Sequence, residues 1–140
     1  MNPQITNGGA FIAPTLGISP QAPTSSGTAI KGSAIDRLGY GSAVLSVAAG
    51  ASSGSPSSFS VAGKIQHSDT TTDGDFTDFT GGAITPITAV DTLAKVNVDL
   101  TGAKRYIRAV VTPTYVGGSS PYVFVGAQVV LAGSSNPPTT

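Results

Sequence analysis

The chain has 140 residues, a formal net charge of zero and no cysteine, and only 10% of its residues are charged. This length favours one domain, the lack of cysteine excludes a disulfide framework, and the zero net charge argues against long-range attraction to nucleic acid or to an anionic membrane. The 18 Gly, the 10 Pro and the absence of Glu argue against a helical bundle. The composition therefore favours an all-β protein.

Residues 1–27 are predicted to form an extended N-terminal arm outside the sheets. Prolines interrupt this segment, and each proline removes a ladder donor and restricts the residue before it. Apolar side chains nevertheless recur along the arm, and a solvated tail is normally poor in them. The arm therefore either folds back on its own domain or lies across a neighbouring subunit. On the second interpretation the candidate contact residues are Phe11, Ile12, Leu16 and Ile18.

Residues 28–132 are predicted to form a single β-sandwich of seven or eight short strands, of jelly-roll or Ig-like topology. Apolar and polar side chains alternate with the period of a half-buried strand in four segments. These segments are 43–49, 58–67, 93–100 and 105–111. Residues 84–90 are predicted to form an edge strand despite Pro86, and residues 133–140 a short C-terminal tail.

The last predicted strand, residues 122–131, is apolar on both of its faces. Such a strand either lies centrally in a sandwich or has one face covered by another chain. On the second interpretation, its outer face would contribute to an interface between copies of the protein. The candidate interface residues are Tyr122, Phe124 and Val130.

Few residues suggest catalysis or metal binding. The run His67-Ser68-Asp69 has the residue types of a hydrolase triad, but consecutive strand residues point to opposite faces and cannot form the relay. The run from Asp69 to Gly74 matches the start of a calcium-binding loop only in part, and a solvated turn explains it as well. We therefore expect no enzyme activity, no metal and no cofactor.

The basic residues Lys95, Lys104, Arg105 and Arg108 are predicted to cluster on neighbouring strands. Cross-strand pairing with Asp91 or Asp99 explains them more simply than contact with nucleic acid, which we do not expect. The longest apolar stretches are too short to span a bilayer, and no basic segment precedes Lys31 as it would in a secretory signal. We expect a protein made in the host cytoplasm, with no membrane partner.

Three runs together resemble a known family: Gly63 to Asp69, Asp75 to Phe79, and Val96 to Thr112. In their pattern of strands and turns they resemble the capsid cement (decoration) proteins of tailed bacteriophages, most closely those of Bordetella podophages. The resemblance implies a jelly-roll-like domain on the outer surface of the virion, where a homo-oligomer, a dimer more than a trimer, ties neighbouring major capsid protein subunits together. It brings no catalytic residues.

The predicted roles follow from this resemblance. The arm residues would anchor on the capsid protein, and the outer face of residues 122–131 would pack in the oligomer. The alternative is a carbohydrate- or receptor-binding module of a phage tail or baseplate, because fold alone does not decide function. For that alternative, the candidate stacking platforms are Tyr40 and Tyr115, which lie near predicted turns.

Overall fold

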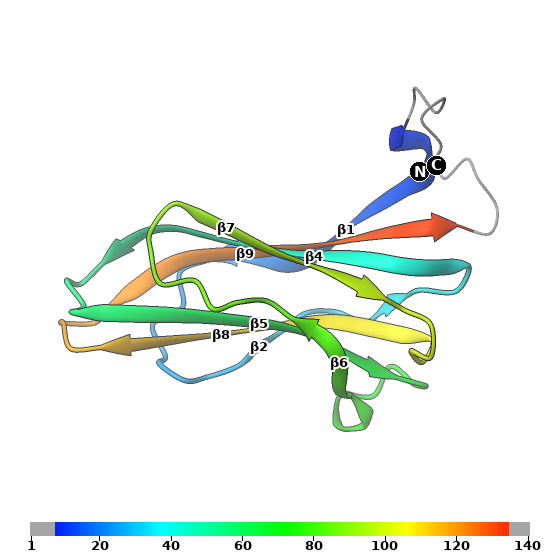
Figure 1. Cartoon of the computed structure of the whole chain (residues 1–140). Coiled ribbons are helices and arrows are strands. Elements are labelled where there is room, and N and C mark those ends of the chain that lie inside the picture. Colours follow the sequence, from blue (N-terminus) through cyan, green and yellow to red (C-terminus); the bar gives the residue numbers. More distant parts are fainter. Residues whose placement is uncertain (1–7, 135–140) are drawn as a thin grey trace.

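The computed structural model describes residues 8–134, which form two antiparallel β-sheets packed face to face (Figure 1). The first sheet has the strand order β1-β9-β4-β7, and the second has the order β2-β8-β5-β6 with β3 also paired to β8. The strands of the first sheet are β1 (Ile12–Gln21), β9 (Tyr122–Ser134), β4 (Tyr40–Ser53) and β7 (Thr92–Asp99). The strands of the second sheet are β2 (Ile30–Lys31), β8 (Tyr106–Val116), β5 (Ser58–Ser68), β6 (Thr77–Ala83) and β3 (Ile35–Asp36).

The strand pairing gives a jelly-roll topology. The chain pairs its first strand with its last, β1 with β9, and then β2 and β3 with β8, β4 with β7, and β5 with β6. When β2 and β3 are counted as one interrupted strand, this is a long hairpin rolled into two sheets of four strands, as in a jelly roll. The topology confirms the predicted all-β sandwich. Of the jelly-roll and Ig-like topologies left open by the sequence, it selects the jelly roll.

The core lies between the sheets, where the predicted alternation is confirmed. In β4 every second side chain is fully or almost fully buried, and in β9 the buried set is Val123, Val125, Ala127, Val129 and Leu131. β5, β7 and β8 contribute Val61, Ile65, Val98, Ile107, Ala109 and Val111. Most of these side chains are Val, Ala and Ile, because β-branched and small residues pack well on a pleated surface.

The N-terminal segment departs from the prediction of an arm outside the sheets. Residues 12–21 form the edge strand β1, which pairs with β9 over most of its length. Pro14 and Pro20 are compatible with this position because an edge strand leaves one row of backbone groups outside the ladder. The register shifts around Gly17, and this shift turns Ile18 into the core. Residues 1–7 of the predicted arm lie outside the described residues.

Two other predicted segments also differ. Residues 84–90 do not form a strand: their pairing with the second sheet is an isolated bridge between Val61 and Ile87, next to Pro86. Residues 133 and 134 of the predicted tail continue β9, and residues 135–140 lie outside the described residues.

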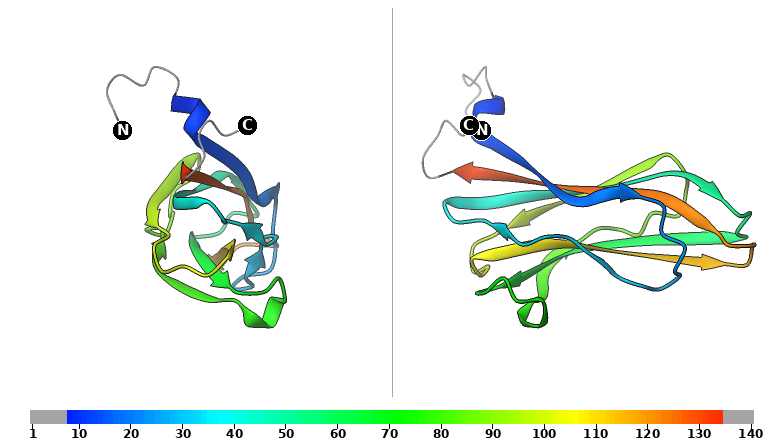
Figure 2. Two further views of the ribbon diagram at one scale, coloured as in Figure 1. Left: turned by 90° about the vertical axis from the view of Figure 1, so that its right-hand side faces the viewer. Right: turned by 180° about the vertical axis from the view of Figure 1, so that it is seen from behind.

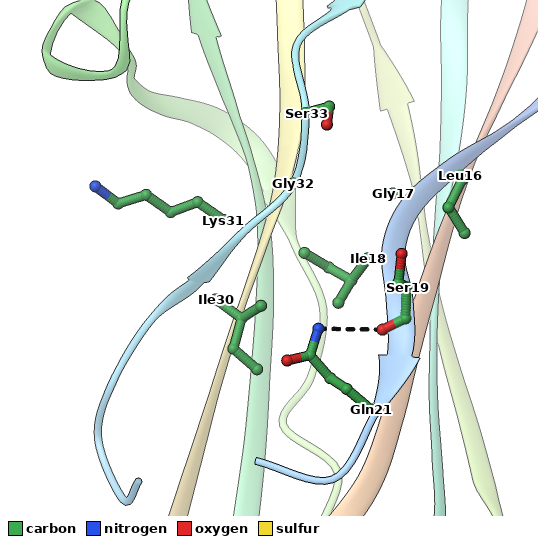
Figure 3. A pocket seen from close by; sticks show the side chains of 9 residues that line it. All are labelled: Leu16, Gly17, Ile18, Ser19, Gln21, Ile30, Lys31, Gly32 and Ser33. Carbon is green, nitrogen blue, oxygen red and sulfur yellow. Dashed lines mark hydrogen bonds between the residues drawn. The ribbon is translucent and has the colours of Figure 1, made fainter.

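The two sheets meet along one side at a close backbone contact between Gly17 and Gly32 (Figure 3). A Cβ atom on Gly32 would lie 2.0 Å from the carbonyl oxygen of Gly17, so this position accepts only glycine without backbone movement. The N–H of Gly32 donates to the carbonyl of Ala109 at 2.8 Å. Figure 3 shows Ile18 and Ile30 in the space beside this contact, a small pocket of about 150 Å³.

Candidate interaction surfaces

The outer faces of the two sheets differ sharply in charge. β1, β9 and β4 contain no charged residue, and the only charges on the first sheet are Lys95 and Asp99 of its edge strand β7. None of the five ion pairs found within residues 8–134 involves a residue of the first sheet. We refer to the outer surface of β1, β9, β4 and β7 as the uncharged face, after its three uncharged strands β1, β9 and β4; Lys95 and Asp99 lie at its β7 edge. A surface with so few charges is suited to burial against protein.

Most of the site residues predicted from sequence lie on the uncharged face. The strand register places Leu16 opposite Gln128, and Pro14 opposite Val130. Leu16 is 60% exposed and Phe124 is 49% exposed, whereas Tyr122 and Val130 are half-buried. Sequence reasoning assigned the arm residues and the β9 residues to two different surfaces. The pairing of β1 with β9 brings them together on one.

Ile18 does not belong to the candidate capsid-binding residues, although the sequence predicts it there. Its side chain is only 2% exposed and belongs to the core, so it is not available to a partner. Phe11 is half-buried and ends the short 3-10 turn η1 (Gly8–Phe11), and the neighbouring Ile12 is 39% exposed. Figures 1 and 2 show η1 and the start of β1 raised above the first sheet, at the end of the molecule where β9 ends.

A hollow of about 320 Å³ lies on the uncharged face. Its lining includes small side chains from the two central strands, Ser46, Ala48 and Gly126, and larger ones from the two edge strands, Leu16 and Leu93. The small residues of β4 and β9 thus leave a depression between the bulkier side chains of β1 and β7. This depression could not be recognised from the sequence, because it depends on which residues of four strands lie side by side.

The outer face of the second sheet carries a polar network around Arg108. This side chain is only 5% exposed, its guanidinium stacks 4.2 Å from the ring centre of Phe76, and it donates to Gln66 at 2.8 and 2.9 Å and to Asp73 at 2.6 Å. Asp73 also accepts from Lys31. The hydrogen bonds from Arg108 and Lys31 hold the pKa of the Asp73 carboxyl below its usual value. Arg108 therefore fixes the segment from Thr70 to Phe76 against the sheet.

The basic residues do not form the predicted cluster. Lys104 pairs with Asp69 at 3.6 Å, Arg105 pairs with Asp36 at 2.8 Å, and Lys95 lies on the other sheet. The predicted pairing with Asp91 or Asp99 is therefore wrong for Lys104, Arg105 and Arg108, because β3 and the segment before β6 supply nearer carboxylates. Arg105 lowers the pKa of Asp36 through its hydrogen bonds.

The segment that partly matched a calcium loop uses its carboxylates internally. Asp69 and Asp73 face cations, and Asp75 accepts a hydrogen bond from the Thr70 hydroxyl at 2.6 Å. Within residues 8–134 no three His or Asp side chains lie close enough together to hold a metal ion. The solvated-turn interpretation therefore explains the segment better than a calcium loop.

His67, Ser68 and Asp69 also have separate partners. The Nδ1 atom of His67 accepts from the backbone N–H of Lys104 at 3.2 Å, and its ring packs edge-on against Phe79 at 5.0 Å. The hydroxyl of Ser68 accepts from the backbone N–H of Thr70 at 3.0 Å. Burial lowers the pKa of His67, and the nearby Lys104 lowers it further. These contacts give His67 a structural role beside the turn that precedes β8.

Tyr115 is not an exposed platform for a sugar. Its side chain is 8% exposed, and its hydroxyl donates to the carbonyl of Pro23 at 2.6 Å. The same hydroxyl accepts from the backbone N–H of Val123 at 3.2 Å. Burial raises the pKa of this phenol. Tyr40 is half-buried and packs against the core. The structure thus uses Tyr115 to tie the segment after β1 to the sandwich.

Comparisons with known proteins relate the chain to others by fold alone. No protein-family model matches the sequence, and no curated protein matches it. A chain of the infectious bursal disease virus Gx strain is 12% identical with a TM-score of 0.50, and the match covers 91% of this chain and 34% of that one. At this identity the likeness shows a shared fold and no more. Within residues 8–134, no helix is long and apolar enough to cross a membrane.

Two further solved structures are similar over most of their length. The SPBc2 prophage-derived protein YomS is 16% identical with a TM-score of 0.40, and the match covers 85% of this chain and 94% of that one. A protein of Bacillus endospore appendages, which form disulfide-linked pili, is 13% identical with a TM-score of 0.42, and the match covers 89% and 90% of the two chains.

Proposed function

We propose that the chain is a structural protein of a virus particle and, more specifically, a capsid cement (decoration) protein. In this role it binds the outside of a phage head and bridges neighbouring major capsid protein subunits. The observation that supports the proposal most directly is the uncharged face, in which three adjacent strands of a jelly roll carry no charge and present a surface suited to burial against protein. The sequence resemblance to phage cement proteins and the fold shared with a chain of a virus structure point in the same direction.

The proposed task depends on geometry and copy number rather than on chemistry. Packaged DNA pushes a shell outward, and a protein that contacts two subunits raises the free energy needed to separate them. Many weak contacts repeated over a lattice act multivalently, so each contact can have a modest affinity. A sandwich is suited to this task because its two packed sheets transmit force without rearrangement.

The test is binding to particles that lack the protein. We expect purified chain to sediment with DNA-filled heads until its copy number is comparable to that of the major capsid protein, and to raise the temperature at which the heads release their DNA. Heads that already carry their full complement serve as the control and should take up no more. Binding confined to a few copies per particle, or binding without a change in DNA release, would contradict the proposal.

A further inference from the structure

Lys95 is the one cation of the chain that makes neither an ion pair nor a side-chain hydrogen bond within residues 8–134. It is exposed and projects from β7 on the uncharged face, as does Asp99 four residues later. At about 3.3 Å per residue their Cα atoms lie ~13 Å apart, too far for a direct pair within one chain. Asp99 accepts hydrogen bonds from Thr101, two residues further along the chain, and forms no ion pair within residues 8–134.

We propose that the uncharged face binds a second copy of the chain through a two-fold axis that crosses the strands at the level of Asn97. The register places Asn97 beside Val44, Val44 beside Val130, and Val130 beside Pro14. Rotation about this row superposes each position on β7 with the position equally far on the other side of Asn97. Lys95 of one copy then faces Asp99 of the second copy, and Asp99 of the first faces Lys95 of the second.

The same two-fold rotation brings apolar residues of β1, the edge strand opposite β7, into contact with each other. Leu16 shares a row with Lys95, and Ile12 shares a row with Asp99. Leu16 of one copy therefore lies against Ile12 of the other, and Val44 and Val130 meet their own counterparts on the axis. Such reciprocal pairing is what a two-fold interface requires. The charge pattern is complementary only between two antiparallel copies of β7.

The shape of the face agrees with this arrangement. Figures 1 and 2 show the turn η1 raised above the first sheet. In the proposed dimer this turn lies beyond Leu16 of the other copy, toward the hollow that Leu16 lines. Phe11 would therefore contact a second copy and not the capsid protein. Four strands about 4.8 Å apart and ten residues long cover roughly 600 Å² per copy. This area is at the lower end of what stable protein interfaces bury on each partner, which is about 800 Å² on average.

This inference deepens the proposed function: it rests on the homo-oligomer that the resemblance to cement proteins implies, and it names the surface through which two copies meet. The experiment uses the purified full chain without particles, so a failure to dimerise leaves the test of particle binding separate. Sedimentation equilibrium over a range of concentrations measures the dissociation constant of the dimer. We expect the wild-type chain to dimerise, and a chain that stays monomeric at all concentrations would overturn the inference.

Charge exchange tests the pairing of Lys95 with Asp99. In the dimer, Lys95→Asp places a new carboxylate opposite Asp99 at both symmetry-related contacts. We expect the dissociation constant of the dimer to rise about tenfold. Asp99→Lys should have a similar effect through paired cations. The double variant, Lys95→Asp with Asp99→Lys, should restore the wild-type constant within about threefold, because the pairs re-form with exchanged signs. Equal dimerisation of all four proteins would overturn the proposed register.

A second variant tests whether the two copies meet through their uncharged faces or through the edges of their β7 strands. Val44→Lys places a charge at the two-fold axis in the centre of the uncharged face and should abolish the dimer. Thr114→Lys is the matched control, because Thr114 is exposed on the outer face of the second sheet. We expect this control to dimerise as the wild type does. If Val44→Lys dimerises normally while Lys95→Asp does not, β7 pairs edge to edge and the face-to-face arrangement is wrong.

Discussion

The single histidine shows how a residue without a catalytic role can still respond to pH. Nδ1 of His67 accepts a hydrogen bond from the backbone of Lys104, and an imidazole can accept at this atom only when it is neutral. Burial and the charges of Lys104 and Arg37 lower the pKa of His67, and the opposing effect of Asp69 is smaller than those of burial and Lys104. The folded state therefore binds a proton less readily than the unfolded chain.

We predict that the chain loses stability as the pH falls below about 6.5, the ordinary pKa of His. Between this value and the lower pKa of folded His67, the unfolded state binds more protons, so the free energy of unfolding decreases with falling pH. The midpoint of urea denaturation should be lower at pH 5.5 than at pH 7.5. His67→Asn keeps an acceptor near the Nδ1 position and should reduce this difference. An equal difference in both proteins would contradict the role assigned to His67.

At the same scale, Arg108 shows what periodicity alone misses. Alternation on β8 correctly predicts that Ile107, Ala109 and Val111 are buried. It also places Arg108 on the outer face, where a charged residue is expected to be solvated. The segment that carries Phe76 and Asp73 folds over this face and buries the guanidinium. The partner lies 35 residues away in sequence, so no local pattern could have identified it.

At the scale of elements, the strands in which apolar and polar residues alternate could be predicted, whereas the proline-containing edge strand β1 could not. β4, β5, β7, β8 and β9 each turn one apolar face to the core, so their alternation is visible in the sequence. β1 was missed because its prolines argue against a strand in general, although they permit an edge strand. Residues 84–90 were wrongly predicted as a strand, since their apolar residues pack on the core with only one bridge to the sheet.

The contact between β1 and the segment after β2 leads to a prediction about Gly32. A Cβ atom there would lie 2.0 Å from the backbone oxygen of Gly17 and 3.2 Å from that of Ala109, and backbone cannot rotate away as a side chain can. We expect Gly32→Ala to lower the free energy of unfolding by about 1–3 kcal/mol. Urea denaturation measures this change.

Gly41→Ala provides the control for this comparison. The nearest atom to a Cβ on Gly41 is a carbonyl oxygen at 3.8 Å, which is an ordinary contact. We expect the control to change the free energy of unfolding by less than about 0.5 kcal/mol. If Gly32→Ala were as stable as Gly41→Ala, the close approach of the two sheets at this side would be contradicted.

At the scale of the whole molecule, the candidate surface depends on register. The sequence predicts most of the residues, including Leu16, Phe124 and Val130, because apolar residues that lie outside the expected core face can be recognised in the sequence. Their common face could not be predicted, because it requires β1 to pair with β9 across more than 100 residues of sequence. Nor could the sequence show that Lys95 has no ion-pair partner within residues 8–134, because the folded chain decides which partner each cation finds.

The most direct test of the cement proposal is a count of this chain in purified particles. Quantitative mass spectrometry of particles from its source gives the number of copies relative to the major capsid protein. We predict a number comparable to that of the major capsid protein, since a cement protein repeats with the lattice it stabilises. A few copies per particle would assign the chain to a tail or receptor-binding structure, and its absence from particles would contradict a structural role in the virion.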